Sequence, residues 1–268
     1  MKQTYKTKNC HPAKSKRTIK RNTCITHNTI DEIKQNEHYA NIRSVDQLYK
    51  KHNCNDDLCL LKTTPKPIQQ LLLRDFRPVM PQKWKTNPNE WLSNKDILDV
   101  IQQYEEAFHY FHFVGPTPID FDAMVTPSQC VTEEMCQFNI DNEQKRGKQF
   151  VAIVFNLDKH NESGSHWTSM FIDIPQQTIY YFDSAHNNVP AEVKTFVKRV
   201  APEFAFFSNR VQHQRGNTEC GMYSLYFIIQ MLVSKHRKRL FANRFNHPSH
   251  RINDKTVETF RKIYFTPL

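Results

Sequence analysis

The segment GMYSLYFIIQMLV, from Gly221 to Val233, is the stretch that most constrains how this chain folds. Almost all of its residues are apolar, so it has no polar face to present to water. Such a segment predicts a helix that is buried on all sides. It is too short to span a bilayer, which takes about 18 residues or more. The rest of the chain must therefore supply a folded core that surrounds this helix.

Three β-type runs precede the buried helix, at residues 150–157, 167–172 and 178–183. The connections between them are too short for parallel crossovers, which predicts consecutive antiparallel strands. A further strand is expected over 204–212, and helices after Pro190 and near 254–264. The sequence thus predicts an α+β fold, with a central, mostly antiparallel sheet flanked by helices.

An amphipathic helix is predicted before the strands. Ser93 and Asp96 form a capping box at its start, and apolar residues continue at three- and four-residue spacing as far as Phe111. Gly115-Pro116 is the expected end. Prolines at 78, 81 and 88 break the chain ahead of this helix and place a domain boundary near 85–90. We expect a helical N-terminal arm over 31–88 and the main domain over 89–268.

The first 30 residues carry eight Lys or Arg and no acid, whereas residues 31–268 hold 29 basic and 27 acidic side chains. The net charge of +10 therefore belongs mainly to this tail. A basic, disordered, solvated tail over 1–30 is the ordinary interpretation. Binding to nucleic acid or to an acidic partner is an alternative, and a nuclear-import signal is another.

Seven cysteines are spread along the chain, at positions 10, 24, 54, 59, 130, 136 and 220. Their number is odd and no apolar leader opens the sequence, so we expect unpaired thiols in a reducing intracellular compartment. The spacings Cys54-x4-Cys59 and Cys130-x5-Cys136 do not fit a paired zinc motif. We expect no metal and no organic cofactor.

Cys220 stands where a polar loop joins the buried helix. A helix N-terminus carries partial positive charge and free N–H groups, which favour a thiolate and can stabilise an oxyanion. Gly221 permits close approach of a substrate backbone. A structural cysteine at a helix start is the competing explanation, because free cysteine is among the most buried residue types.

A cysteine nucleophile needs a base, and the base needs an orienting partner. His166 opens one predicted strand and Asp183 ends the next, and adjacent antiparallel strands can bring such positions together. Gln214 lies six residues before Cys220 and can donate its side-chain N–H to an oxyanion. Each of the 13 histidines alone is more often a surface or core residue, but the ordered set is far more restrictive. Three of the five glycines, at 164, 216 and 221, lie beside these positions.

The order His166-Trp167, then YFDS with Asp183, then Gln214-x5-Cys220-Gly221 resembles the SUMO/ubiquitin-like-protein-specific cysteine protease clan, to which adenain belongs. Within that clan, QRGNTECGMYSL and the Cys54/Cys59 pair are most similar to polyprotein-processing proteases of large DNA viruses of the African swine fever and mimivirus kind. The resemblance is specific over about 150–235 and weaker over 89–150. It implies a papain-like, adenain-like core with the catalytic cysteine at the N-terminus of the buried helix.

The resemblance also implies roles for individual residues. Cys220 is expected to be the nucleophile, His166 the general base and Asp183 its orienting partner. Gln214 and the Cys220 backbone N–H would form the oxyanion hole. The substrate-binding residues would be Trp167, whose ring narrows the channel, and Gly221. African swine fever-type enzymes carry Asn where this chain carries Asp183.

The predicted function is that of a cysteine endopeptidase that cleaves viral structural precursors after Gly-Gly-like sites during virion maturation. It would act on polypeptide substrates in the virion and the host cytoplasm, with no membrane span. One alternative is removal of SUMO- or ubiquitin-like modifiers from host proteins. Another is a non-catalytic virion scaffold that binds nucleic acid through the basic tail, although a scaffold has no need for the complete His-Asp-Gln-Cys set.

Overall fold

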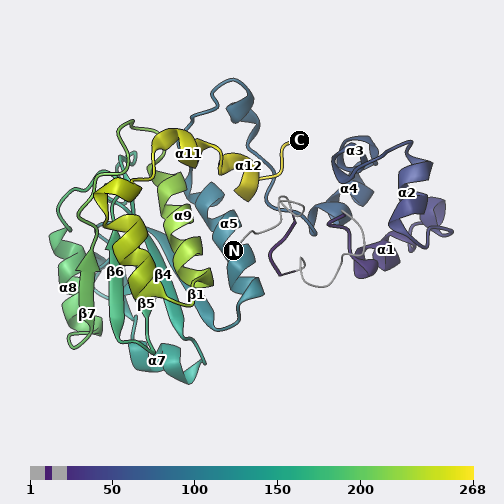
Figure 1. The fold of residues 1–268 in the computed structure, drawn as a ribbon. Coiled ribbons are helices and arrows are strands. Elements are labelled where there is room, and N and C mark those ends of the chain that lie inside the picture. The colour runs from purple at the N-terminus through teal and green to yellow at the C-terminus, as the bar shows by residue number, and fades with distance from the viewer. Residues whose placement is uncertain (1–9, 14–22) are drawn as a thin grey trace. The chain divides into compact units, whose positions relative to one another are not determined.

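The structure is a computed structural model that describes residues 10–13 and 23–268. The chain forms two compact units, one made of the residues up to Pro88 together with Thr259–Leu268, the other of Asn89–Glu258 (Figure 1). The last ten residues thus group with the N-terminal unit, although the sequence analysis assigned them to the main domain. The eight basic residues of the predicted tail lie outside the described residues, so that prediction stands as it was made.

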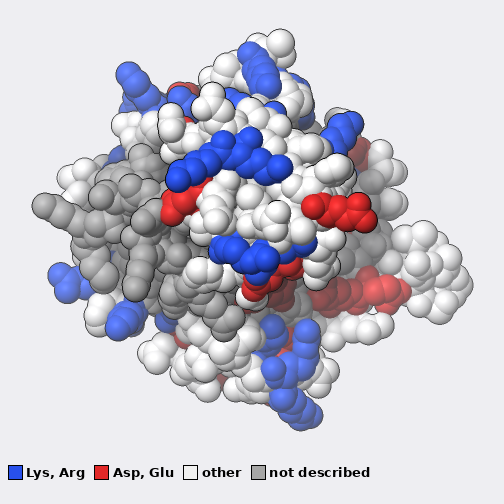
Figure 2. Space-filling model, turned by 90° about the vertical axis from the view of Figure 1, so that its right-hand side faces the viewer, with Lys and Arg blue, Asp and Glu red and all other residues white. Residues whose placement is uncertain are grey.

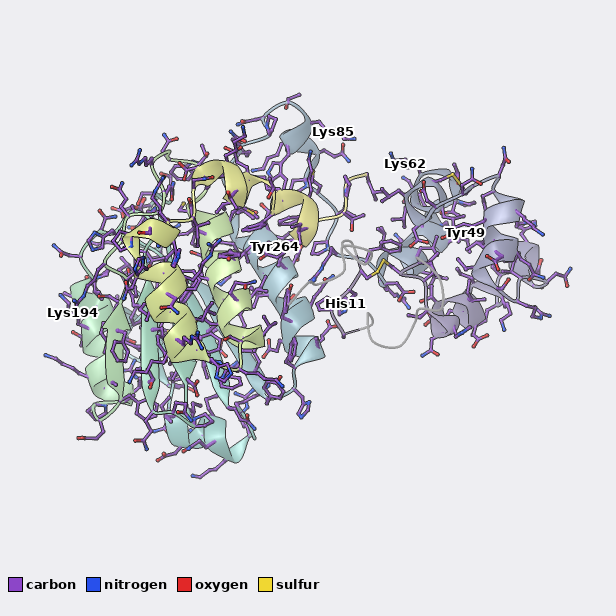
Figure 3. The ribbon with its side chains drawn as sticks, viewed as in Figure 1. His11, Tyr49, Lys62, Lys85, Lys194 and Tyr264 are labelled. Atoms are coloured by element: carbon purple, nitrogen blue, oxygen red, sulfur yellow. A yellow bond between two sulfur atoms is a disulfide. The ribbon has the colours of Figure 1, made fainter. Side chains whose placement is uncertain are left out.

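The N-terminal unit is helical. Its elements are α1 (His27–Ile33), η2 (Glu37–Tyr39), α2 (Val45–Lys51), α3 (Asp57–Thr63), α4 (Lys66–Leu73), η3 (Gln82–Lys85) and α12 (Arg261–Tyr264). Leu48, Leu60 and Leu72 are fully buried at its centre. The Asp57 carboxylate accepts hydrogen bonds from the Thr23 hydroxyl, at 2.7 Å, and from the Tyr49 hydroxyl on α2. Tyr49 is labelled in Figure 3. Part of the segment predicted as a tail is therefore packed against the arm.

Charge is mixed on the described surface. On the face drawn in Figure 2, Lys and Arg side chains lie among Asp and Glu side chains. This agrees with the nearly equal numbers of basic and acidic residues over 31–268.

Six of the seven cysteines are joined in disulfides: Cys10–Cys24, Cys54–Cys59 and Cys130–Cys136. Only Cys220 has a free thiol, and it is buried. The prediction of unpaired thiols is therefore wrong for all six. Helix ends and a hairpin bring the partners to Cα separations of 5.0, 5.5 and 6.6 Å, which disulfides can bridge. Sequence spacing alone did not reveal that proximity.

The second unit is built on a five-stranded sheet in the order β1-β4-β5-β6-β7. The strands are β1 (Phe111–Pro118), β4 (Phe150–Asn156), β5 (Trp167–Asp173), β6 (Thr178–Phe182) and β7 (Ala205–Ser208). The two inner pairings, β4 with β5 and β5 with β6, are antiparallel as predicted. The two outer pairings are parallel, so the sheet is mixed.

The strand β1 replaces the last turns of a predicted helix. The Ser93–Asp96 capping box is present, and α5 (Asn94–Ala107) follows it. The helix ends at Ala107, and the chain continues from Phe111 as a strand paired with β4. Phe108 and Phe111 match the helical spacing only by coincidence. The hydrogen bonds between β1 and β4 favour a strand over the helix that this spacing predicts.

Helices cover both faces of the sheet (Figure 1). On one face lie α5 and α9 (Cys220–Val233), and α9 packs along β5. On the other, α8 (Ala191–Val200) contributes Val193 and Phe196 to a core shared with Ile153 and Ile172 of the sheet. The remaining elements are β2 (Met124–Thr126), β3 (Gln129–Cys130), α6 (Glu133–Cys136), α7 (Ile140–Lys145), α10 (Arg237–Leu240), η4 (Phe241–Phe245), η5 (Pro248–His250) and α11 (Asp254–Glu258). No helix among the described residues is long and apolar enough to cross a membrane.

The register of the strands brings three chain segments to one end of the sheet. Asn156 at the end of β4 pairs with Trp167 at the start of β5. Phe182 at the end of β6 pairs with Ser169, two residues further along β5. His166, just before β5, and Asp183, just after β6, are therefore held at the same end.

Candidate active site

Cys220 is the first residue of α9, and Glu219 caps the helix. The first bond within the helix runs from the Tyr223 N–H to the Glu219 carbonyl at 2.9 Å. The N–H groups of residues 220–222 therefore point out of the helix end, as at any helix N-terminus. Cys220 is only 1% exposed. A helix terminus and a buried thiol thus coincide at this residue.

His166 is hydrogen-bonded to Asp183, and Cys220 also acts on its pKa. Its Nε2–H donates to the Asp183 Oδ1 at 2.6 Å, and its side chain is 16% exposed. Burial lowers the pKa of His166, but hydrogen bonds with the Asp183 carboxylate and the Cys220 thiol outweigh burial and raise the pKa to about 10. At neutral pH the imidazole therefore holds its proton between a carboxylate and a sulfur atom.

The Asp183 carboxylate accepts three hydrogen bonds, all from N–H groups. Besides His166, it accepts the Ala185 N–H on Oδ1 and the Asn187 N–H on Oδ2, both at 2.9 Å. Burial raises the pKa of Asp183, but these donors, His166 foremost, hold it below its ordinary value. The carboxylate thus stays ionised although it is 1% exposed. It fixes both the ring orientation and the proton on Nε2.

Asn209 positions Asp183, and the sequence analysis missed it. Its Oδ1 accepts the Asp183 N–H at 2.9 Å, and its Nδ2 donates to the Asp183 carbonyl at 2.8 Å. Asn209 is 4% exposed and follows the edge strand β7. An asparagine after a short strand is common, so nothing in the sequence singles out Asn209.

Gln214 lies in the segment that leads to Cys220, and its amide is held in one orientation. The Ser184 hydroxyl donates to Gln214 Oε1 at 2.7 Å, and Nε2 donates to the Gly216 carbonyl at 2.9 Å. An amide nitrogen carries two N–H groups, so the second can serve an oxyanion. Ser184, which follows Asp183 in the YFDS motif, was not singled out from the sequence. Its position next to Asp183 was the available signal.

Asp254 at the start of α11 anchors the same segment. One carboxylate oxygen accepts the N–H groups of Arg215 and Gly216 at 3.1 and 3.0 Å. The other accepts the Tyr223 hydroxyl of α9 at 2.9 Å. Asp254 thereby ties the loop before Cys220 to the helix after it. It lies 34 residues further along the chain, so sequence reasoning had no means of finding it.

Trp167 and Gly221 lie together and pack against Leu92. Trp167 is 5% exposed, and its Nε1–H donates to the Leu92 carbonyl at 3.0 Å. A Cβ on Gly221 would lie 2.8 Å from Leu92 Cδ1 and 3.2 Å from Trp167 Cδ1. Position 221 is therefore a glycine because Leu92 and Trp167 occupy the space of a side chain. That both residues also line the substrate channel stays a prediction.

The loop before β5 sets the position of His166. The His166 carbonyl accepts the Leu157 N–H at 2.9 Å. Gly164 has φ +90°, and a Cβ there would lie 2.6 Å from Asn156 Nδ2. Both the backbone conformation and the space require glycine. Gly164 therefore shapes the turn that delivers the base.

The arrangement has relatives among known proteases. Residues 136–268 match the family described as "Ulp1 protease family, C-terminal catalytic domain". A protein named as a thiol protease in Acanthamoeba polyphaga mimivirus is 28% identical over 203 residues, 73% of this chain and 62% of that protein. The cysteine protease of African swine fever virus is 28% identical over 191 residues, 65% of this chain and 67% of that protein. In some isolates it is named a SUMO-1 cysteine protease.

A solved structure extends the likeness to the fold of nearly the whole chain. The crystal structure of the African swine fever virus protease matches with a TM-score of 0.65 and 20% identity, covering 97% of each chain. At that identity the likeness concerns the fold, and it confirms the predicted α+β architecture. The residues that match the catalytic-domain model of the Ulp1 protease family, 136–268, contain His166, Asp183, Gln214 and Cys220.

Proposed function

We propose that the chain is a cysteine endopeptidase in which Cys220 is the nucleophile and His166 the proton carrier. The observation that carries this proposal is the position of His166, which hydrogen-bonds to the Asp183 carboxylate at 2.6 Å and whose pKa both Asp183 and the Cys220 thiol raise. An ionised sulfur next to a protonated imidazole is the reactive form of such a pair. Asp183 keeps the imidazole in place during both proton transfers.

The reaction follows in two halves. The Cys220 thiolate attacks the peptide carbonyl carbon, a C–S bond forms, and the carbonyl electron pair moves onto oxygen. The Cys220 N–H and Gln214 Nε2 stabilise that oxyanion. The C–N bond then breaks, and the leaving amine takes the proton of His166. In the second half, water attacks the thioester and gives a proton to His166, and the thiolate is released with the carboxylic acid product.

The burial of the site supports a preference for cleavage after small residues such as Gly-Gly. Cys220, Gln214 and Trp167 are 1%, 3% and 5% exposed, so a substrate reaches the sulfur through little open space. A narrow approach admits glycine and rejects side chains that branch at Cβ. Trp91 is partly exposed and immediately precedes Leu92, which packs on Gly221. It joins Trp167 as a second aromatic candidate for the wall of that approach.

As substrates we propose structural precursor proteins that are cut during virion maturation, as the viral relatives suggest. The disulfides favour the virion over the host cytoplasm as the working compartment, because disulfides persist on virion surfaces and are rare in reducing cytosol. The second candidate is removal of a ubiquitin-like modifier, which the printed name of the African swine fever virus relative supports. A nucleic-acid partner has only the basic tail in its favour, and the relatives add no support.

One experiment separates these substrates. The protein is incubated with the virus's structural precursors and, separately, with SUMO and ubiquitin conjugates, and the new N-termini are sequenced. Cleavage of precursors after Gly-Gly-like pairs, absent in Cys220→Ala, is expected. Efficient cleavage of modifier conjugates alone would select the second candidate, and cleavage by Cys220→Ala would exclude the nucleophile assignment.

A further inference from the structure

A hairpin near the active site exposes apolar side chains. It consists of β2 and β3, which pair in antiparallel fashion. Met124 and Val125 on β2 are 58% and 57% exposed. Among the described residues these are the two most exposed large hydrophobic side chains, ahead of Val233 and Val79. Adjacent exposed apolar residues on one short element are typical of a contact surface.

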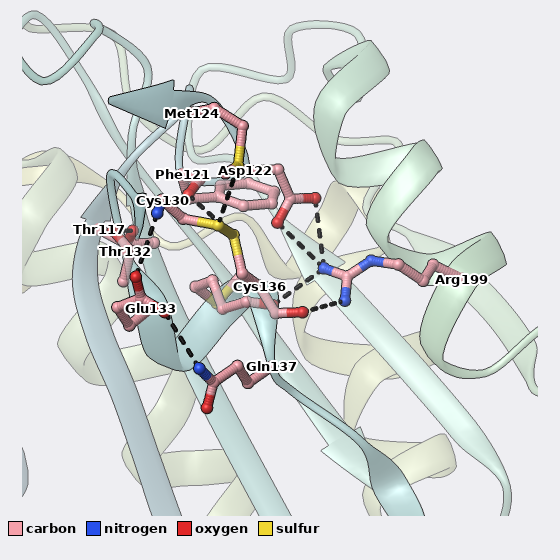
Figure 4. The surroundings of a disulfide bond; sticks show 11 residues. Thr117, Phe121, Asp122, Met124, Cys130, Thr132, Glu133, Cys136, Gln137 and Arg199 are labelled. Atoms are coloured by element: carbon pink, nitrogen blue, oxygen red, sulfur yellow. Dashed lines mark hydrogen bonds and ion pairs between the residues drawn. A yellow bond between two sulfur atoms is a disulfide. The ribbon is translucent and has the colours of Figure 1, made fainter. Parts of the chain in front are cut away.

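The base of the hairpin is rigidly held (Figure 4). The Cys130–Cys136 disulfide ties β3 to α6. The Val131 and Thr132 N–H groups donate to the carbonyls of Ala123 and Phe121 at 2.9 and 3.1 Å. Phe121 at the root is fully buried in the core. The exposed apolar side chains of β2 are therefore presented by a fixed support, which reduces the entropy lost on binding.

A second anchor reaches the hairpin from α8. Arg199 donates to the Asp122 carboxylate at 3.0 and 3.2 Å, and to the Met135 and Cys136 carbonyls at 2.9 Å each (Figure 4). The Arg199 guanidinium thus joins Asp122, which lies just before β2, to α6. The exposed side chains of Met124 and Val125 take no part in this network.

The hairpin stands at the catalytic end of the sheet. It follows the carboxyl end of β1, which runs parallel to β4, and β4 ends where Trp167 begins β5. Asp120 at the root binds the loop before β5 through the His160 N–H at 2.8 Å and the His160 ring at 2.7 Å. The Ile119 N–H also donates to the Asp158 carbonyl of that loop at 3.1 Å. His166 ends the same loop.

The charge around the hairpin narrows the choice of partner. Residues 111–144 contain six acidic side chains and no Lys or Arg. Four of these acids have basic or histidine partners: Asp122 has Arg199, Asp120 has His160, Glu134 has His112, and Glu143 has His112 and Arg146. Glu133 and Asp141 are exposed and have no ion-pair partner among the described residues, so this surface keeps negative charge and disfavours nucleic acid and anionic membranes. It fits a protein surface whose apolar centre has a basic rim.

We propose that the β2–β3 hairpin is a docking surface for the folded body of the polypeptide substrate, away from the peptide bond that is cut. Met124 and Val125 enter an apolar patch of the substrate, and the acidic flanks face its Lys and Arg side chains. The proposal rests on the proposed protease function and adds a second contact with the substrate. Short peptides cannot make that contact, whereas folded substrates make it and bind the enzyme more tightly as a result.

The test compares two substrates in one variant, Met124→Ser/Val125→Ser. One substrate is a Gly-Gly peptide with a fluorogenic leaving group, and the other is the folded precursor or modifier fusion that the parent cleaves. We expect kcat/KM on the folded substrate to fall about tenfold through KM, as when apolar contact residues are truncated. The peptide rate should stay within about twofold, because Met124 and Val125 do not touch the catalytic residues. Both side chains are exposed, so Tm should not change.

Val233→Ser is the matched control. Val233 is 48% exposed at the last residue of α9, the helix that begins at Cys220, about 20 Å along its axis. It should change neither rate. Equal losses on peptide and folded substrate, or no loss on either, would overturn the proposal. A shift in oligomeric state in the double variant would instead assign the hairpin to self-association.

Failure of the protease function gives a different result. The parent would then cut neither substrate, and Cys220 would not react with an electrophilic Gly-Gly peptide. Docking is measured independently by the affinity of the Cys220→Ala protein for the folded precursor. A loss of that affinity on adding Met124→Ser/Val125→Ser supports the hairpin, and an unchanged affinity refutes it.

Discussion

Replacing Asp183 by Asn and by Ala tests how the base is held. The carboxylate accepts three hydrogen bonds, from the His166 ring and from the Ala185 and Asn187 N–H groups, and it has no acceptor beside it. In Asp183→Asn, the remaining oxygen can keep His166 and Ala185, which share Oδ1, but the new NH2 group faces the Asn187 N–H. One buried donor loses its partner, at a cost of about 2 kcal/mol. In Asp183→Ala all three donors lose theirs and a small cavity forms, at about 4 kcal/mol.

These costs convert to measurable shifts. For a unit of this size, Tm should fall roughly 4–8 °C in the Asn variant and about twice that in the Ala variant. Loss of a partner that orients a catalytic group costs about 10–100-fold in activity, so we expect kcat/KM to fall by that factor in Asp183→Asn. In Asp183→Ala, where the ring is also released, the fall should reach about 10³-fold or more. Differential scanning calorimetry and hydrolysis of a fluorogenic peptide provide both numbers.

The pH dependence separates charge from geometry in the same variants. The pKa of His166 is raised to about 10, so its contribution to stability is complete below its unfolded value near 6.5 and disappears as pH rises toward 10. The alkaline limb of kcat/KM should lie in the same window, because the imidazole must carry its proton. Without the carboxylate, that limb should move to lower pH by about one unit or more. Equal losses in Asn and Ala with an unmoved alkaline limb would refute this account.

Two further predictions concern the surroundings of the nucleophile. Gln214→Ala should lower kcat about 10²–10³-fold with little change in KM. Ser184→Ala should lower kcat about tenfold, because the Gln214 amide loses the hydroxyl that orients it. A rise in KM as large as the fall in kcat would contradict an oxyanion role for Gln214. Gly221→Ala should destabilise the protein by about 1–3 kcal/mol, because its Cβ would lie 2.8 Å from Leu92 Cδ1. The double variant Leu92→Ala/Gly221→Ala should recover part of that loss in urea unfolding, and purely additive losses would refute the steric explanation.

Some of this structure could be predicted because local signals agreed with tertiary demands. The Ser93–Asp96 box starts α5, the short connections make β4, β5 and β6 antiparallel, and the apolar segment after Cys220 is the buried helix. The predicted proximity of His166 and Asp183 is also found, because they lie at strand ends that the register brings together. That prediction needed only the pairing of neighbouring strands.

Other features depend on contacts between distant residues. The strand β1 pairs with β4, which begins 39 residues after Phe111, and that pairing overrode a helical spacing. Asn209 and Asp254 hold the site through bonds to segments 26 and 38 residues away. Trp167 follows the base in sequence, and its ring is 5% exposed with its Nε1–H bonded to the Leu92 carbonyl. Adjacency in sequence was a poor guide to exposure there.

The disulfides change how the free thiol should be understood. A thiolate attacks disulfides as well as carbonyl groups, so a reactive Cys220 is a hazard in a chain with three S–S bonds. Cys220 is 1% exposed between α9 and the strand ends, so a disulfide has little access to its sulfur, whereas Cys130 and Cys136 lie partly exposed at the base of the hairpin. Burial that excludes a disulfide also excludes bulky substrates. The same enclosure supports the proposed preference for an extended peptide with glycine at the bond to be cut.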